Sequence, residues 1–431
     1  MDINSELLSF ISRSPTAFHA VENIRRFLLS AGYRELFEGE DWTVAPGDRV
    51  FVRRNGSSII ALRIPAQTPA GLMLAAAHSD SPSFKIKDNA LIAGPDGYVR
   101  VNVEKYGGML CAPWLDRPLS VAGRVTVRQD GALVSRLCDL QRPVALIPNV
   151  AIHMDRTVNE GKNYAAHVDM LPLYSLSPDR SLDALAAESL GVAEGDIVSK
   201  DLFLYPLAPG MLWGAEEEFI SSPRLDDLQC VFGCLNGFLE AEDSQSIAGL
   251  CVFDNEEVGS GTRQGADSTL LGDVLRRVCA ALGLDESGYL RLVANGFMVS
   301  ADNAHAVHPN HGEYADRNDR PRMNGGIVIK YNANARYTTD SVSAAVFAEI
   351  CRAEGVDVQR FTNRADKPGG STLGNISLAH VSLDCVDIGL AQLAMHSCYE
   401  TAGARDTEAL VRAMRAYYSR SYRREGDTVH I

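Results

Sequence analysis

Apolar and polar residues follow two kinds of pattern along this chain. From Ala17 to Leu29 apolar residues recur at helical spacing, and Gly32 stands where a C-terminal cap belongs, which predicts a helix. The runs 58–64 and 72–77 are short and strand-like, and the second is almost wholly apolar. Because strands covered on both faces have continuous apolar runs, these patterns predict a central sheet covered by helices.

The pattern changes between about residues 92 and 212. Segments 98–103 and 121–127 alternate apolar and polar residues between Gly, Pro and Asp turns, which predicts mainly β structure. After Pro223 strands and helices alternate again, with helices expected at 226–240, 269–282 and 340–354 and strands at 248–253, 296–300 and 326–331. The polar runs 179–194 and 310–324 are expected to be exposed loops. We therefore predict one α/β domain formed by residues 1–91 and 213–431, interrupted by a β-rich domain at 92–212.

Composition narrows the class of protein. The 431 residues exceed the usual size of a single core, and 46% apolar with 22% charged residues is ordinary for a globular chain. A net charge of -14, without a broad cluster of Lys and Arg, argues against nucleic acid as a partner. No run reaches membrane length and no export signal is visible. The nine cysteines are scattered singly along the chain, and most of them lie within apolar runs. We expect a reduced, cytoplasmic protein that does not enter a membrane.

Five segments place His or carboxylate residues at the ends of predicted strands or in the next turn, where ligands bind in open α/β sheets. They contain His78, Asp226, Glu256 with Glu257, Asp302 and His396. Taken singly, each has an ordinary structural explanation, such as a helix N-cap for Asp226 or a core histidine for His396. Together, two His and three carboxylates suit two cations such as zinc, at a separation of about 3.5–4 Å.

Two further residues fit a metal-dependent reaction. Asp80 lies two residues after His78 and can accept the imidazole's other N–H. If Glu257 binds metal, the adjacent Glu256 is free to take a proton from metal-bound water, whose pKa falls to roughly 7. The chain has no His-Glu-x-x-His, Gly-x-Ser-x-Gly or phosphate-loop motif, and Gln264 stands where the third glycine of a dinucleotide loop belongs.

Taken in order and spacing, these segments resemble the aspartyl aminopeptidase family, dinuclear zinc exopeptidases that assemble as tetrahedral dodecamers. The resemblance runs from Ser14-Pro-Thr-Ala-Phe-His19 to the final histidine, through 77–82, 222–226, 254–260, 300–305 and 395–396. It implies a zinc-exopeptidase-like αβα sandwich with a mainly β inserted dimerisation domain. It also implies that His78, Asp226, Glu257, Asp302 and His396 bind two divalent ions, with Asp226 bridging them. Zinc is expected, with manganese and cobalt as alternatives.

The resemblance extends to the remaining roles. It implies Glu256 as the general base, Asp80 as the residue that orients His78, and peptides with a free acidic N-terminus as substrates. Lys330 would bind the substrate's side-chain carboxylate, with Tyr337 nearby; the alternative is an ordinary strand lysine that reaches solvent. The inserted domain would pair subunits of a homododecamer built from dimers, with His153 reaching a neighbour's active site. The match loosens at Asn149, where many members carry His.

Other functions remain open at this point. A dinuclear aminopeptidase for neutral residues and an amino-acid deacylase would use similar ligands, and substrate panels distinguish them. A non-catalytic assembly protein could also retain metals. The unligated Glu256 argues against that reading, because a structural metal site is closed and needs no spare base.

Overall fold

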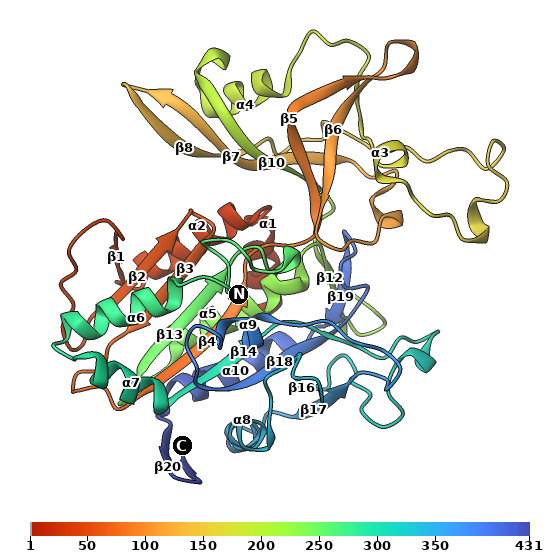
Figure 1. The fold of residues 1–431 in the computed structure, drawn as a ribbon. Helices are drawn as coiled ribbons and strands as arrows, with labels where there is room; N and C mark the ends of the chain where they lie inside the picture. The colour runs from red at the N-terminus through yellow and green to blue at the C-terminus, as the bar shows by residue number, and fades with distance from the viewer. Residues whose placement is uncertain (1) are drawn as a thin grey trace.

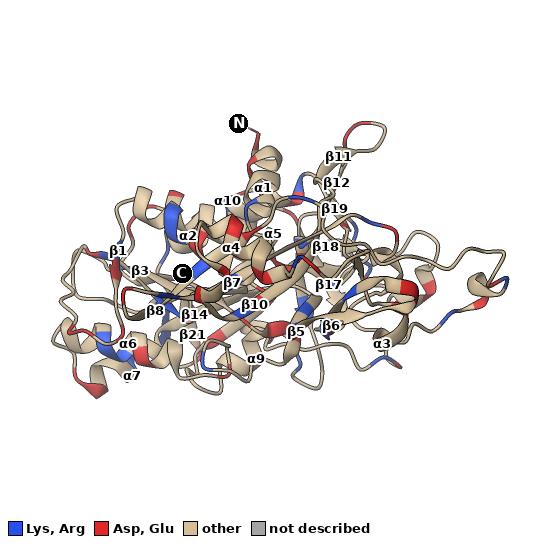
Figure 2. Ribbon diagram, turned by 90° about the horizontal axis from the view of Figure 1, so that it is seen from above, with Lys and Arg blue, Asp and Glu red and all other residues tan. Residues whose placement is uncertain are grey.

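The computed structural model describes residues 2–431, and within them the strands form a large sheet, a six-stranded sheet and a terminal hairpin (Figure 1). The hairpin comprises β20 (Arg423–Glu425) and β21 (Thr428–His430). In Figure 1 the six-stranded sheet lies above the larger one. Basic and acidic residues are interspersed over both units in the view of Figure 2. None of the helices in residues 2–431 has both the length and the apolar character needed to cross a bilayer.

The centre of the large sheet consists of four neighbouring parallel strands. In spatial order they are β13 (Ile247–Phe253), β4 (Leu72–His78), β14 (Gly296–Ala301) and β18 (Asp384–Leu393). Every residue of β4, β13 and β14 is buried, as the apolar runs predict. Because the four strands are parallel, their carboxyl ends meet at one edge of the sheet.

The other strands extend this sheet on both sides. On the β13 side lie β3 (Ser58–Arg63), β2 (Arg49–Arg54) and β1 (Arg34–Leu36). On the β18 side lie β19 (Glu400–Gly403), β12 (Phe219–Ser222), β11 (Met211–Trp213), β15 (Ala304–His305), β16 (Ile327–Tyr331) and β17 (Val358–Thr362).

Helices cover both faces of the large sheet. One core contains α1 (Ile3–Ser12), α2 (Ala17–Ser30), α5 (Leu225–Glu240), α8 (Ser341–Ala353) and α10 (Asp406–Tyr418). The opposite core contains α6 (Leu270–Ala281), α7 (Glu286–Ala294) and α9 (Leu373–Ser377). Successive β4 residues alternate between these cores, with Met73 and Ala75 in the first and Leu72 and Leu74 in the second. The expected αβα sandwich is therefore confirmed.

The six-stranded sheet has its own core and only antiparallel neighbours. Its order is β8 (Ala132–Asp139), β7 (Leu119–Gln129), β10 (Ile197–Pro206), β5 (Ser83–Ala93), β6 (Val99–Tyr106) and β9 (Leu173–Ser175), with α3 (Ala166–Asp169) and α4 (Leu182–Leu190) beside it. The six-stranded sheet thus extends from Ser83 to Pro206, whereas the inserted domain predicted from the sequence covers residues 92–212. The division into domains, and a role of this unit in pairing subunits, stay predictions.

Short 3-10 helices occur between these elements. They are η1 (Pro95–Gly97), η2 (Ala112–Trp114), η3 (Val158–Glu160), η4 (Glu194–Asp196), η5 (Glu256–Val258) and η6 (Gly312–Tyr314).

Three local expectations are settled by these elements. Gly32, which follows the C-cap residue Ala31 of α2, adopts a positive φ of 83°, as its capping position requires. The loop expected at 179–194 is wrong, because α4 lies within it and buries Leu182 and Leu185 against the sheet. Cys230 and Cys234 are free and fully buried on α5, which agrees with the reduced cysteines expected from the sequence.

Candidate metal centre

Four of the five predicted ligands come from the carboxyl ends of the parallel strands. His78 is the last residue of β4, Glu257 follows β13, Asp302 follows β14, and His396 follows β18. The fifth, Asp226, lies at the start of α5 and is buried. The αβα topology therefore brings together residues that are up to 318 positions apart in the sequence, at the edge where such sheets bind ligands.

The spacing of the facing atoms suits shared cations. His78 Nε2 lies 3.5 Å from Asp226 Oδ1, and His396 Nε2 lies 3.5 Å from Asp226 Oδ2 and 3.4 Å from Glu257 Oε2. These distances are longer than a good hydrogen bond. They equal the roughly 3.3–3.6 Å that separates two ligand atoms on one tetrahedral zinc with bonds of about 2.0–2.2 Å.

Asp226 belongs to two groups of possible ligands. One group is His78, Asp226, Asp227 and Asp302, and another is Asp226, Glu257 and His396. A third group combines His78 with Glu256 and Glu257. Within each group the candidate ligand atoms lie within 4.8 Å of one another.

Several oxygens in this cluster are buried without a hydrogen-bond partner in the described chain: Asp226 Oδ1, Asp227 Oδ1 and Glu257 Oε1. Burying such atoms unpaired is costly, so each calls for an explanation. A divalent cation bound through these oxygens would remove the cost. Imidazole nitrogen and carboxylate oxygen are both ordinary zinc ligands, so the residues present fit the metal.

The electrostatics of the cluster also favour cations. Burial opposes a charged imidazole, but Asp227, Asp226 and Asp80 outweigh it and raise the pKa of His78 well above its usual range. Burial, followed by the Asp226 carboxylate, raises the pKa of Glu257 well above its normal value. The group therefore holds protons when no other cation is present, and binding of a metal would displace them.

Asp80 organises the loops around this cluster. Its backbone oxygen lies 3.0 Å from His78 Nδ1, and its Oδ1 lies farther away at 3.5 Å. A carbonyl can only accept, so Nδ1 carries a hydrogen, and Nε2, which faces Asp226, is the nitrogen left to bind a metal. The Asp80 carboxylate instead accepts hydrogen bonds from the backbone N–H groups of Glu256 (3.1 Å) and Glu257 (3.2 Å).

Lys330 and Tyr337 lie beside the cluster. Lys330 is 3% exposed, so it does not reach solvent as an ordinary strand lysine would, and its Nζ lies 3.7 Å from Asp302 Oδ1. Burial opposes its charge, but Asp302 outweighs this effect and raises the pKa of Lys330. The Tyr337 ring centre is 5.5 Å from the same Nζ. A buried ammonium group thus adjoins the candidate metal centre.

Comparison with known proteins identifies the family. Residues 10–418 match the model of the aminopeptidase I zinc metalloprotease family, M18. The chain belongs to the M18 family. Family members described as probable M18 family aminopeptidase 2 are 42% identical in Clostridium acetobutylicum, over 97% of this chain and 99% of the relative, and 41% identical in Pseudomonas aeruginosa, over 97% and 99%. This M18 chain is therefore a zinc metallo-aminopeptidase, a hydrolase.

Solved M18 structures share the fold. The chain in the cryo-EM structure of the Ape4 and Nbr1 complex is 35% identical with a TM-score of 0.94, and the match covers 97% of this chain and 85% of that one. The S. cerevisiae mApe1 dodecamer is 27% identical with a TM-score of 0.86, covering 97% of this chain and 96% of that one.

His153 is the one predicted site residue of this M18 chain that the fold does not bring to the cluster. It lies in an exposed loop of the six-stranded unit, and its side chain forms no hydrogen bond or ion pair with residues 2–431. That loop projects beyond α3 in Figure 1. Its predicted role needs a second subunit.

Sequence reasoning missed Glu400. Its carboxylate accepts hydrogen bonds from Asp226 N at 3.0 Å and His396 N at 2.8 Å, and so holds two predicted ligands by their backbone. Burial, followed by the Asp226 charge, raises the pKa of Glu400 to about 8. The only sign of Glu400 in the sequence is its position four residues after the candidate ligand His396. Carboxylates at such a spacing are too common to identify a functional residue.

Proposed function

We propose that this M18 aminopeptidase removes an N-terminal Asp or Glu from peptides, with two zinc ions held side by side. His78, Asp226 and Asp302 would hold one ion, and Asp226, Glu257 and His396 the other. This assignment is supported by the direction of the Asp226 oxygens, because Oδ1 faces His78 and Oδ2 faces His396. One carboxylate bridging two ions needs this arrangement.

In the proposed reaction Glu256 is the general base. When bound, zinc supplies Lewis acidity, which polarises the peptide carbonyl and makes water a stronger acid. Glu256 would accept the proton of the attacking water and return it to the leaving amine. Burial, and then nearby carboxylates, raise the pKa of Glu256 to about 7, so the side chain can exchange protons near neutral pH. Asp80 fixes its position by accepting its backbone N–H.

The proposed preference for an acidic N-terminal residue is supported by the burial of Lys330 next to Asp302. If Asp302 binds a cation, its charge is shared with that cation, and Lys330 keeps most of its positive charge for another partner. In a buried position that charge needs an anion. The side-chain carboxylate of a substrate's first residue would supply it, whereas a Leu side chain would leave the ammonium group unpaired.

The first test is a comparison of kcat/KM for Asp, Glu, Leu and Lys amides of one chromogenic amine. The enzyme is saturated with zinc or manganese, and an EDTA-treated sample is the control. We expect metal-dependent cleavage with Asp and Glu preferred. A preference for Leu would retain the metal-dependent reaction but exclude the acidic pocket, and no cleavage by metal-replete enzyme would exclude the proposed function.

Replacing Lys330 with Met should abolish the acidic preference. Methionine keeps an unbranched side chain of similar length but removes the charge, and a charged hydrogen bond is worth about 1.5–3 kcal/mol, or about 10–150-fold. We expect kcat/KM for the Asp substrate to fall by that factor while the Leu substrate is much less affected. Lys200→Met is the matched control, because Lys200 pairs with Asp183 in the six-stranded unit. An unchanged Asp-to-Leu ratio in Lys330→Met would remove Lys330 from the pocket.

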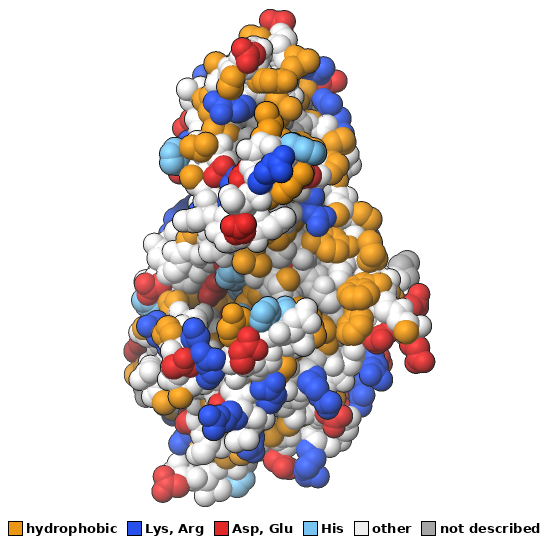
Figure 3. All heavy atoms as spheres, turned by 90° about the vertical axis from the view of Figure 1, so that its right-hand side faces the viewer, with side chains coloured by type: hydrophobic (Ala, Val, Ile, Leu, Met, Phe, Trp, Pro, Cys, Tyr) orange, Lys and Arg blue, Asp and Glu red, His pale blue; other side chains and the backbone are white. Residues whose placement is uncertain are grey.

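We also propose that the enzyme is a homododecamer built from dimers, in which His153 reaches a neighbouring active site. Exposed apolar side chains support a pairing surface on the six-stranded unit, including Ile152 at 47% and Met154 at 84% exposure. Figure 3 shows apolar side chains at the surface of this upper unit. The S. cerevisiae mApe1 structure is a dodecamer, which agrees with this assembly.

A further inference from the structure

We propose that residues 106–110, the segment that begins at the last residue of β6, position the metal centre from outside and make zinc binding depend on the six-stranded sheet. We call these residues the β6 segment. The inference rests on the ligands of the proposed function and adds residues that lie in the other structural unit. Its support is that the segment contacts three site residues on three different loops: Asp80, Glu257 and His396.

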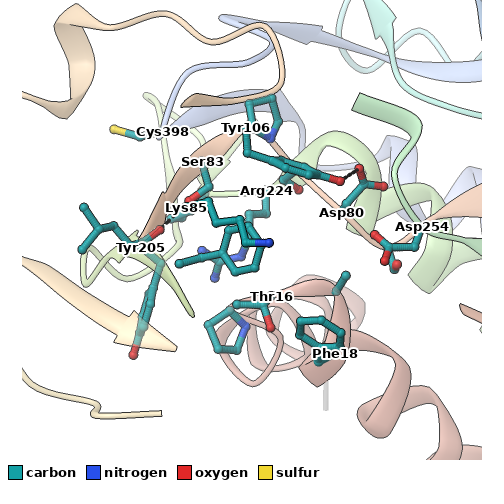
Figure 4. Close-up of a pocket in the computed structure, with 18 of the residues that line it drawn as sticks. Thr16, Phe18, Asp80, Ser83, Lys85, Tyr106, Tyr205, Arg224, Asp254 and Cys398 are labelled. Atoms are coloured by element: carbon teal, nitrogen blue, oxygen red, sulfur yellow. Dashed lines mark hydrogen bonds between the residues drawn. The ribbon is translucent and has the colours of Figure 1, made fainter. Parts of the chain in front are cut away.

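The first contact is made by a side chain. The Tyr106 hydroxyl donates a hydrogen bond of 2.6 Å to Asp80 Oδ2 (Figure 4). It also accepts one of 2.8 Å from Asn255 Nδ2. Tyr106 thereby links the loop after β4 to the loop after β13 that carries Glu256 and Glu257. Burial, followed by the Asp80 charge, raises the pKa of Tyr106, so its hydroxyl stays protonated and remains a donor.

Figure 4 also shows the surroundings of this contact. Tyr106 and Asp80 line a cavity of about 210 Å³ between the two structural units, with Phe18 and Arg224 among its other lining residues. The Tyr106 ring packs edge-on against Phe203 of β10, with the ring centres 5.7 Å apart. The ring is therefore held by the six-stranded sheet while its hydroxyl reaches the large sheet. Tyr106 therefore joins the two units at this point through its ring packing and its hydroxyl hydrogen bonds.

The second contact is a close backbone approach. Gly107 has a positive φ of 77°, and a Cβ added there would lie 3.1 Å from Glu257 Cβ and 3.4 Å from Glu257 O. Glycine is needed both for the backbone conformation and for the space. The backbone of Gly107 thus packs directly against a predicted metal ligand.

The third contact sets the orientation of His396. The Gly108 carbonyl oxygen lies 2.5 Å from His396 Nδ1, and Leu110 N donates a hydrogen bond of 3.0 Å to the His396 backbone oxygen. Because the carbonyl can only accept, Nδ1 carries the hydrogen, and Nε2 is left to face Asp226 and Glu257. A shift of the β6 segment would therefore rotate one ligand and displace another.

Loss of such outer contacts typically lowers metal affinity or activity by about 10–100-fold. The test uses two variants, each with a matched control. Gly107→Ala is paired with Gly97→Ala, because Gly97, in the turn between β5 and β6, has a similar φ of 84° but nothing within 4 Å of an added Cβ. Tyr106→Phe is paired with Tyr205→Phe, because Tyr205 also donates a 2.6 Å hydrogen bond to a carboxylate, that of Asp139.

The dissociation constant for zinc is measured by competition with a chromophoric chelator, and the visible spectrum of the cobalt-substituted protein reports ligand geometry. We expect Gly107→Ala and Tyr106→Phe to bind zinc about 10–100-fold more weakly or to lower kcat by that factor, with KM nearly unchanged and an altered cobalt spectrum. Gly97→Ala and Tyr205→Phe should match the wild type in zinc affinity and spectrum.

The result that overturns the proposal is wild-type zinc affinity, cobalt spectrum and kcat in both test variants. If Gly107→Ala does not fold, as judged by thermal unfolding, the Tyr106 and Tyr205 pair decides alone. A wild-type protein that binds no zinc would instead refute the ligand assignment of the proposed function, and this proposal with it. Zinc binding by the wild-type protein therefore distinguishes failure of this proposal from failure of the proposed function.

Discussion

Replacing Glu256 with Gln should lower kcat by about 10²–10⁴-fold and leave zinc binding close to that of the wild type. Glutamine keeps the size of the side chain and the backbone N–H that Asp80 accepts, but it cannot take a proton from water. The loss should therefore appear in kcat and not in KM or metal content. Measurements of kcat, KM and zinc per chain on the same preparation test this expectation.

The control for this variant is Glu104→Gln, which makes the same chemical change at an exposed position of β6. Near-wild-type turnover is expected there. Full activity in Glu256→Gln would refute the general-base assignment, and loss of zinc from that variant would indicate that Glu256 serves as a ligand together with His78 and Glu257.

Replacing Asp226 with Asn should remove both zinc ions and reduce turnover below detection. Asp226 is the residue shared by the two ligand groups, and its oxygens face different histidines. Asparagine keeps the shape but has one oxygen and no charge, so it cannot bridge two cations. We expect zinc affinity to fall by more than the roughly 100-fold that marks the loss of an outer contact. Elemental analysis after dialysis gives the zinc content per chain.

A comparison with Asp302→Asn sharpens this prediction, because Asp302 occurs in only one of the two groups that contain Asp226. That variant should keep the ion bound by Asp226, Glu257 and His396. Asp273→Asn, a change on α6 away from the cluster, controls for the substitution itself. Two zinc ions per chain in Asp226→Asn would contradict the bridging role.

Much of the fold follows from local pattern. The wholly apolar run of β4 and its neighbours predicts buried strands, because only strands covered on both faces lack polar alternation. Helices such as α5 and α8 were expected within one residue of their observed ends. The helix α4 was missed because polar residues such as Asp179 and Glu194 flank it and its apolar face is short. Its burial against the six-stranded sheet stabilises it, and local sequence does not report that contact.

The candidate ligands could be assigned from the sequence through the family resemblance, because residues such as Asp226 and His396, taken singly, have ordinary structural explanations. Their mutual distances could not. Asp226 and His78 are 148 positions apart, and their separation of 3.5 Å depends on how α5 packs against β4. The burial of Lys330 was equally open, because a strand pattern does not say whether a neighbouring strand and loop cover its side chain.

The sequence by itself determined which segments are buried strands, where polar residues interrupt them, and which residue types are available for catalysis, because burial is encoded in local periodicity. Only the tertiary structure decided the contacts that join distant segments. These include Glu400 holding Asp226 and His396, and Tyr106 and Gly108 reaching Asp80 and His396 from another sheet. The physical reason is that such contacts are made at the meeting of two separately packed cores, and no local pattern records how those cores lie against each other.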